Sequence, residues 1–239
     1  MPQSPNLQKT AKRQLLPALA LFLLLAGPVA AQGFDKGGEA FDRDDYPTAL
    51  DLFRPLAEQG DADAQFRLGI RYEGGLGVVQ DHAEAAKWYR KAAEQGKAGH
   101  QFYLGTVYAE GRGVVEDHVE AAKWYRRAAE QGHAPGQCNL GVAYAEGRGV
   151  VQDHVEAAKW ARRAAEQGYA LCQYNLGVLY AQGRGVPQHY VQAHKWFNLS
   201  AAQGEANAAE ARDAVATLMS KEQISEAQKL AREWAPKQE

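Results

Sequence analysis

The feature that most constrains this chain is an internal period of 36 residues. Tryptophans recur at that spacing, at Trp88, Trp124, Trp160 and Trp196. The aligned units share a closing AAEQG or SAAQG segment and contain no gaps; they are residues 61–96, 97–132, 133–168 and 169–204. A fixed period of this length is typical of repeat arrays, in which each unit packs on its neighbours. We therefore predict a stacked array rather than one globular core.

Each unit is predicted to form two helices. In the second unit, Leu104, Gly105 and Tyr108 lie at helical spacing, which predicts a first helix, here called helix A, over 98–110. Glycines in the Gly-x-Gly-Val loop that follows end this helix because they tolerate positive φ. The second helix, helix B, is predicted to open at Asp117, since Asp117 and Glu120 have capping-box spacing. The same pair recurs as Asp81/Glu84 and Asp153/Glu156, with His189/Gln192 as a weaker version.

Both ends of the array have predicted caps. Residues 32–60 form a partial repeat, in which 46–60 match helix B and 34–43 supply a short first helix. Residues 205–239 are predicted to form a capping helix pair, over 206–218 and 221–234. Such ends are expected because a terminal repeat has no neighbour to cover its outer face.

The first 31 residues are predicted to be a secretory signal peptide. Lys9, Lys12 and Arg13 precede an apolar run of about 12 residues, and small residues follow it. A membrane span needs about 20 residues, so cleavage after Ala31 is favoured over a membrane anchor. No Cys lies beside the cut, so no lipid anchor is expected. The mature chain is therefore expected to be periplasmic or fully secreted, with no membrane span, and to be a monomer.

The charge balance argues against nucleic acid as a partner. The chain has 27 Lys and Arg against 29 Asp and Glu, and residues 1–31 hold three of the bases and none of the acids. The remainder is therefore net acidic, whereas proteins that bind nucleic acid present a basic surface.

The repeat pattern resembles the Sel-1-like repeat, a relative of the tetratricopeptide repeat with a longer loop. The resemblance rests on A-x-x-x-L-G-x-x-Y, G-x-G-V, A-x-K-W and A-A-x-Q-G in register in four copies, and it covers about residues 34–235. It implies an all-α fold, a right-handed α-solenoid of antiparallel helix pairs with a concave inner face. It also implies binding and scaffolding as the class of function.

No catalytic residue, metal site or cofactor is predicted. His82, His118 and His154 recur at one position, but equivalent positions of stacked helices lie roughly 8–10 Å apart, too far to share a metal ion. These histidines are expected to be solvated at helix starts. The serines lack the motifs of known nucleophiles, and the Gly-x-Gly loops lack the Lys-Ser/Thr of a phosphate loop.

Two further ladders have structural interpretations. Arg112, Arg148 and Arg184 lie in the loops, where we expect exposed side chains, although they could contact an acidic partner. The four tryptophans are expected to be core residues rather than a platform on which sugars stack.

Cys138 and Cys172 lie on the A helices of adjacent units, two repeat positions out of phase. Two positions rotate side chains by about 200° on a helix. A bridge also needs Cα atoms within about 7 Å, and neighbouring A helices usually lie farther apart. We therefore favour two separate thiols, although export would permit a disulfide.

By resemblance, the residue before Leu-Gly points into the concave groove; these residues are Arg67, Tyr103, Asn139 and Asn175. Asn can bond both N–H and C=O of an extended peptide, and Arg can bind a carboxylate. The sequence thus predicts a non-catalytic adaptor or regulator of the bacterial envelope that binds a protein or peptide on its concave face. One alternative is a secreted factor that binds host or competitor proteins. Another is a β-lactam- or peptidoglycan-active enzyme, which is disfavoured because the repeats lack the paired cysteines of Sel-1-like proteins linked to that activity.

Overall fold

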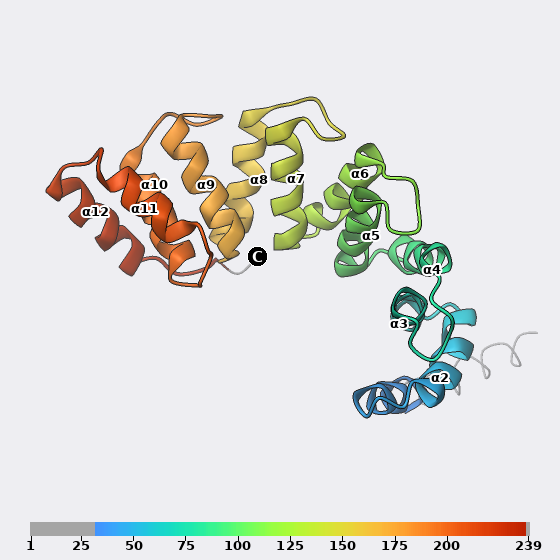
Figure 1. The fold of residues 1–239 in the computed structure, drawn as a ribbon. Coiled ribbons are helices and arrows are strands. Elements are labelled where there is room, and N and C mark those ends of the chain that lie inside the picture. The colour runs from blue at the N-terminus through green and yellow to red at the C-terminus, as the bar shows by residue number, and fades with distance from the viewer. Residues whose placement is uncertain (1–31, 238–239) are drawn as a thin grey trace, which may run out of the picture. The chain divides into compact units, whose positions relative to one another are not determined.

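The computed structural model describes residues 32–237, in which all regular secondary structure is helical (Figure 1). A helix over 32–42 comes first. The helices that follow are α2 (Tyr46–Glu58), α3 (Ala62–Gly74), α4 (His82–Glu94), α5 (Ala98–Glu110), α6 (His118–Glu130), α7 (Ala134–Glu146), α8 (His154–Glu166), α9 (Ala170–Gln182), α10 (Tyr190–Ala201), α11 (Ala208–Ala216) and α12 (Lys221–Arg232). The predicted signal peptide lies outside the described residues. Between residues 32 and 237, none of the helices has the length and apolar character needed to cross a membrane.

The helix boundaries follow the predicted pattern closely. Helix α5 occupies the residues predicted for a helix A, and α6 begins directly after Asp117. The Asp117 carboxylate accepts the backbone N–H of Glu120 at 2.9 Å, and Asp81 and Asp153 cap α4 and α8 in the same way. The acid of each predicted capping box forms a different contact, because its side chain pairs with a lysine three residues on, as Glu120 does with Lys123. In the final pair, α11 is two residues shorter than predicted at each end, and α12 begins as predicted but ends two residues earlier.

The chain divides into two compact units, and the first ends at Gln80. Its core contains Phe53 and Leu68, both fully buried. Arg71 is also buried, with 1% of its surface exposed, and its guanidinium carbon lies 4.5 Å from the ring centroid of Phe41 and 5.1 Å from that of Phe53. Burial lowers the pKa of Arg71 from its ordinary value. Two aromatic faces compensate part of the lost hydration of this cation.

The second unit, from Asp81 onward, is a stack of antiparallel helix pairs. Helices α5 and α6, α7 and α8, and α9 and α10 form the closest pairs, and each pair packs on the next (Figure 1). A glycine in each A helix permits this closeness. A Cβ added at Gly141 would lie 3.2 Å from the carbonyl oxygen of Ala157, so α7 approaches the backbone of α8 directly.

The Gly-x-Gly loop of each repeat packs against the preceding repeat. Gly149, the second glycine of its loop, has φ of +71° and lies against the carbonyl group of His118, at the start of helix B in the preceding repeat. A Cβ at Gly149 would collide with that carbonyl oxygen. Gly113 and Gly185 lie against His82 and His154 in the same way. Each loop therefore covers the start of helix B in the repeat before it.

A ladder of buried glutamines also links the repeats. Gln137 in α7 donates from Nε2 to the carbonyl oxygen of Ala129 at 3.2 Å. Its own Oε1 accepts from Nε2 of Gln167, the glutamine of the closing AAEQG segment, at 2.9 Å. The equivalent pairs are Gln131 with Gln101 and Gln203 with Gln173, both at 2.8 Å. A buried hydrogen bond contributes about 1 kcal/mol, and an unpaired amide would cost more than that.

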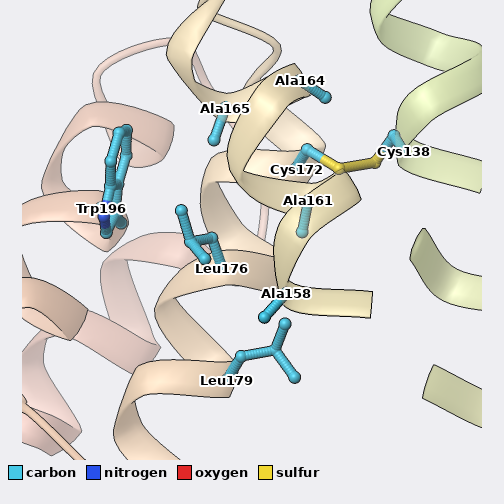
Figure 2. Packing of buried hydrophobic residues seen from close by; sticks show 9 residues of the cluster. All are labelled: Cys138, Ala158, Ala161, Ala164, Ala165, Cys172, Leu176, Leu179 and Trp196. Carbon is cyan, nitrogen blue, oxygen red and sulfur yellow. A yellow bond between two sulfur atoms is a disulfide. The ribbon is translucent and has the colours of Figure 1, made fainter. Parts of the chain in front are cut away.

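The tryptophans mostly serve the core, as predicted. Trp124, Trp160 and Trp196 are buried, and Trp88 is half-buried. Trp196 lies in an apolar cluster with Leu176, Leu179 and the alanines of α8 (Figure 2). Its ring meets the ring of Trp234 edge to face, with 6.1 Å between centroids. Trp234 thus closes the apolar cluster at the C-terminal end.

Cys138 and Cys172 form a disulfide, so the prediction of separate thiols was wrong (Figure 2). Their Cα atoms lie 5.6 Å apart, within the range that a bridge requires. Equivalent positions on neighbouring A helices point in the same direction, so two side chains that face each other must differ by about half a turn. An offset of about 200° therefore favours a bridge between neighbouring A helices, contrary to the expectation from the sequence.

Candidate functional site

Cavities lie at equivalent places in three successive junctions of the second unit, where one helix pair packs on the next helix. The N-terminal cavity lies between α5, α6 and α7, the central cavity between α7, α8 and α9, and the C-terminal cavity between α9, α10 and α11. Val142 lines the first two, and Val178 and Gln182 line the last two. The cavities are therefore contiguous and follow the repeat.

The N-terminal cavity, of about 300 Å³, contains one member of each polar ladder seen in the sequence. Asn139 comes from α7, His118 from the start of α6, and Arg148 from the loop after α7. His118 Nε2 lies 3.0 Å from Glu116 Oε1, and Arg148 Nε lies 2.7 Å from Glu146 Oε2. Both basic groups of this cavity thus already have a carboxylate partner.

The central cavity, of about 200 Å³, repeats this arrangement 36 residues later with Asn175, His154 and Arg184. Asn175 Nδ2 lies 3.8 Å from Cys138 Sγ, so the disulfide forms part of the wall. Glu146 also lines this cavity, although its carboxylate pairs with Arg148. Two hydrogen-bonding side chains and a cation therefore surround one opening.

The C-terminal cavity, of about 300 Å³, has apolar residues at the same positions. Tyr190 replaces the histidine and Ala211 replaces the asparagine. Phe197 and Val215 form its buried wall, and Leu218 at its edge is 61% exposed. This cavity can accept an apolar side chain, whereas the other two offer polar contacts.

The structure brings together two of the four predicted groove residues. Asn139 and Asn175 are half-buried and line adjacent cavities. Tyr103 packs its ring on Tyr89, with 4.7 Å between centroids, and its hydroxyl accepts from Arg112 at 3.2 Å. The fourth, Arg67, belongs to the first compact unit, where its guanidinium carbon lies 5.7 Å from the Phe34 ring centroid and 5.9 Å from that of Phe53.

The histidine ladder was only partly interpreted correctly. His82 is exposed as predicted, but His118 and His154 are half-buried cavity residues. Arg148 and Arg184 are exposed as predicted, whereas Arg112 is half-buried through its contact with Tyr103.

Convergence of these ladders is the signal that the sequence interpretation missed. The histidine of one repeat lines the same cavity as the asparagine and the arginine of the next repeat, so no single repeat contains a whole cavity. Asn can donate to a carbonyl and accept from an amide N–H, and Arg can bind a carboxylate. A row of such cavities can hold an extended peptide. Over residues 32–237, no group of three or more His, Cys, Asp or Glu is arranged to hold a metal ion.

Stacked antiparallel helix pairs with contiguous inter-repeat cavities define an all-α solenoid, the class of helical-repeat binding proteins. The Sel1 repeat profile matches this chain five times, at residues 35–61, 62–97, 101–133, 134–169 and 170–205. The chain belongs to the Sel1 repeat family, whose members are generally protein-interaction scaffolds.

Solved structures agree with this assignment. A Sel1 repeat protein from Oxalobacter formigenes is 33% identical, with a TM-score of 0.69 over 82% of this chain and 84% of that one. A protective antigen present in uropathogenic Escherichia coli strains, displaying an SLR fold, is 31% identical, with a TM-score of 0.56 over 85% of this chain and 52% of that one. Among curated protein sequences, none matches this chain significantly.

Proposed function

We propose that this chain is an exported, non-catalytic adaptor of the bacterial envelope that holds an extended segment of a partner protein in its row of cavities. The observation that carries the proposal is the repetition of Asn, His and Arg at two adjacent junctions. A compact small-molecule site would need one enclosed pocket, whereas a repeating row matches the repeating backbone of a peptide. The N-terminal segment with its basic start and short apolar run supports export.

The binding proposal is tested by capture from an envelope extract on immobilised mature chain. The test variant is Asn139→Ala with Asn175→Ala, and the matched control is Asn207→Ala, because Asn207 is exposed and its side chain makes no capping hydrogen bond. A partner held in the cavities is expected to be lost with the double variant and retained with the control. Equal capture by both variants would refute the groove.

Two further measurements test the other parts of the proposal. Fractionation of the native host should place the chain in the periplasm, with a mature N-terminus at Gln32; recovery from the culture medium would favour the secreted alternative. Turnover of nitrocefin or of muropeptides would contradict the adaptor proposal and favour the enzyme alternative.

A further inference from the structure

The three cavities differ in charge although they lie at equivalent positions of successive repeats. In the second and third repeats, the residue before the Gly-x-Gly loop is a glutamate that pairs with the arginine of that loop. Glu110 Oε2 lies 2.8 Å from Arg112 Nε, and Glu146 Oε2 lies 2.7 Å from Arg148 Nε. In the fourth repeat the position of the glutamate is occupied by Gln182. The loop cation of that repeat therefore lacks the acid that neutralises its counterparts.

Arg184 is that cation, and it lines the central cavity. Within residues 32–237, the structure shows Arg184 in no ion pair. His154, which lines the same cavity, also lacks the glutamate partner that its counterpart His118 has. His118 has Glu116 at 3.0 Å, whereas the position before His154 that corresponds to Glu116 is Gln152, which donates to the carbonyl of Ala145. The central cavity thus has an excess of basic groups, with Glu146 occupied by Arg148.

The neighbouring C-terminal cavity offers the complementary apolar surface. Its walls include Tyr190 and Phe197, and Leu218 at its edge is largely exposed. Val178 and Gln182 form a common wall with the central cavity, so one ligand can reach both. An anionic group and a large apolar group on the same ligand would each have a matching cavity.

The repeat sets the distance between those two groups. Packed helices lie roughly 8–10 Å apart, which approximates the step from one cavity to the next. A polyproline II segment rises about 3.1 Å per residue with three residues per turn, so side chains three positions apart lie on one face about 9 Å apart. A β-strand places side chains three positions apart on opposite faces.

We propose that the central and C-terminal cavities together bind a partner segment in polyproline II conformation that carries an acidic side chain three residues from a large apolar one. This inference rests on the proposed function and names the chemistry of its partner. Arg184 and His154 bind the carboxylate, Asn175 bonds the backbone between the two groups, and Leu218 with Phe197 contacts the apolar side chain.

The test measures fluorescence anisotropy of labelled, C-terminally amidated peptides against the full mature chain. The parent probe is Ser-Pro-Asp-Pro-Ser-Phe-Pro-Ser, with a second probe in which Asp and Phe are exchanged, because the direction of the segment is not set by the cavities. Replacing Asp by Asn, or moving Phe next to Asp, is expected to weaken binding about tenfold, as loss of a charge-assisted hydrogen bond does. Added salt is expected to weaken the Asp probe more than the Asn probe.

Variants locate the effect. Arg184→Gln should abolish the preference for Asp over Asn. Gln182→Glu should also abolish the preference for Asp over Asn while Arg184 is kept, because it places beside Arg184 the acid that Glu110 and Glu146 provide in the other repeats. Arg112→Gln is the matched control, since it removes the equivalent loop arginine from a position that lines none of the three cavities, and it should preserve the preference. Leu218→Ser should weaken every Phe probe equally.

The outcomes separate this inference from the proposed function. Equal binding of the Asp and Asn probes, or a preference that persists in Arg184→Gln, would overturn the inference. Absence of all peptide binding, with partner capture still dependent on Asn139 and Asn175, would also overturn it and would leave the groove intact. If peptide binding is absent and partner capture does not depend on Asn139 and Asn175, the proposed function itself is refuted.

Discussion

Reducing the bond between Cys138 and Cys172 is expected to destabilise the solenoid locally and strongly. The two residues are 34 positions apart in the sequence. A cross-link that closes a loop of this length lowers the entropy of the unfolded chain by an amount worth about 4 kcal/mol at room temperature. Because repeat arrays gain stability from nearest-neighbour interfaces, the loss should be concentrated in α7, α8 and α9. A second, smaller loss of stability is expected in the helix segments around the central cavity, because the disulfide is part of its wall.

The assay compares guanidinium unfolding of the oxidised and reduced chain by far-ultraviolet circular dichroism, with hydrogen exchange to locate the change. Mass spectrometry should first show that reduction adds two hydrogen atoms. The double variant Cys138→Ala with Cys172→Ala is the control, since its unfolding midpoint should not respond to reductant. Identical midpoints for oxidised and reduced wild-type chain, or a loss spread evenly over all helices, would refute the reasoning.

Three further predictions concern the scaffold. Gly149→Ala should lower the free energy of unfolding by about 3 kcal/mol or more, because φ is positive there and an added Cβ would meet a carbonyl of the preceding repeat. Gly99→Ala is the control, because Gly99 is a helical position with open space around it, and alanine there should instead raise the free energy of unfolding by up to about 1 kcal/mol. Thermal unfolding of both variants measures the two effects. Burial lowers the pKa of His133, whose Nδ1 caps α7, below its ordinary 6.5, so the unfolded chain binds more protons than the folded chain. The free energy of unfolding should therefore fall as the pH drops through 6.5, by up to about 1.4 kcal/mol per pH unit. His133→Asn should flatten this dependence of stability on pH, and an unchanged dependence would contradict His133 as its origin. Asp153→Ala should cost about 1 kcal/mol, since its carboxylate accepts two backbone N–H groups at the start of α8, and an unchanged denaturation midpoint would show that the cap is replaced by water.

The positions of the helices could be predicted from the sequence because local chemistry sets them. Asp117 begins α6 through a hydrogen bond three residues away, and Gly111 ends α5 with a φ of +66°. These signals lie within one repeat and recur at a fixed period. The last two helices have no copies to compare, and they were predicted too long, α11 by two residues at each end and α12 by two residues at its C-terminal end.

The disulfide and the cavities could not be predicted in the same way, because they depend on how one repeat meets the next. Equivalent residues are easy to recognise in an alignment of repeats, whereas Cys138 and Cys172 are non-equivalent residues that face each other. His118 and Asn139 line one cavity across the same kind of boundary. The alignment therefore identified the ladders correctly but gave no information on which ladder would contact which.

The glutamine ladder has a consequence for how such a chain can change length. Each closing glutamine, such as Gln167, donates to the A-helix glutamine of its own unit, Gln137, which in turn donates to a carbonyl of the unit before. An added copy of one whole unit would bring its own donor and acceptor, so every buried amide would stay paired at both new junctions. A partial insertion would leave an amide unpaired. Duplication of complete units is thus the low-cost route to growth, and each new unit would also add one cavity, so the reach of the binding surface and the length of the array would increase together.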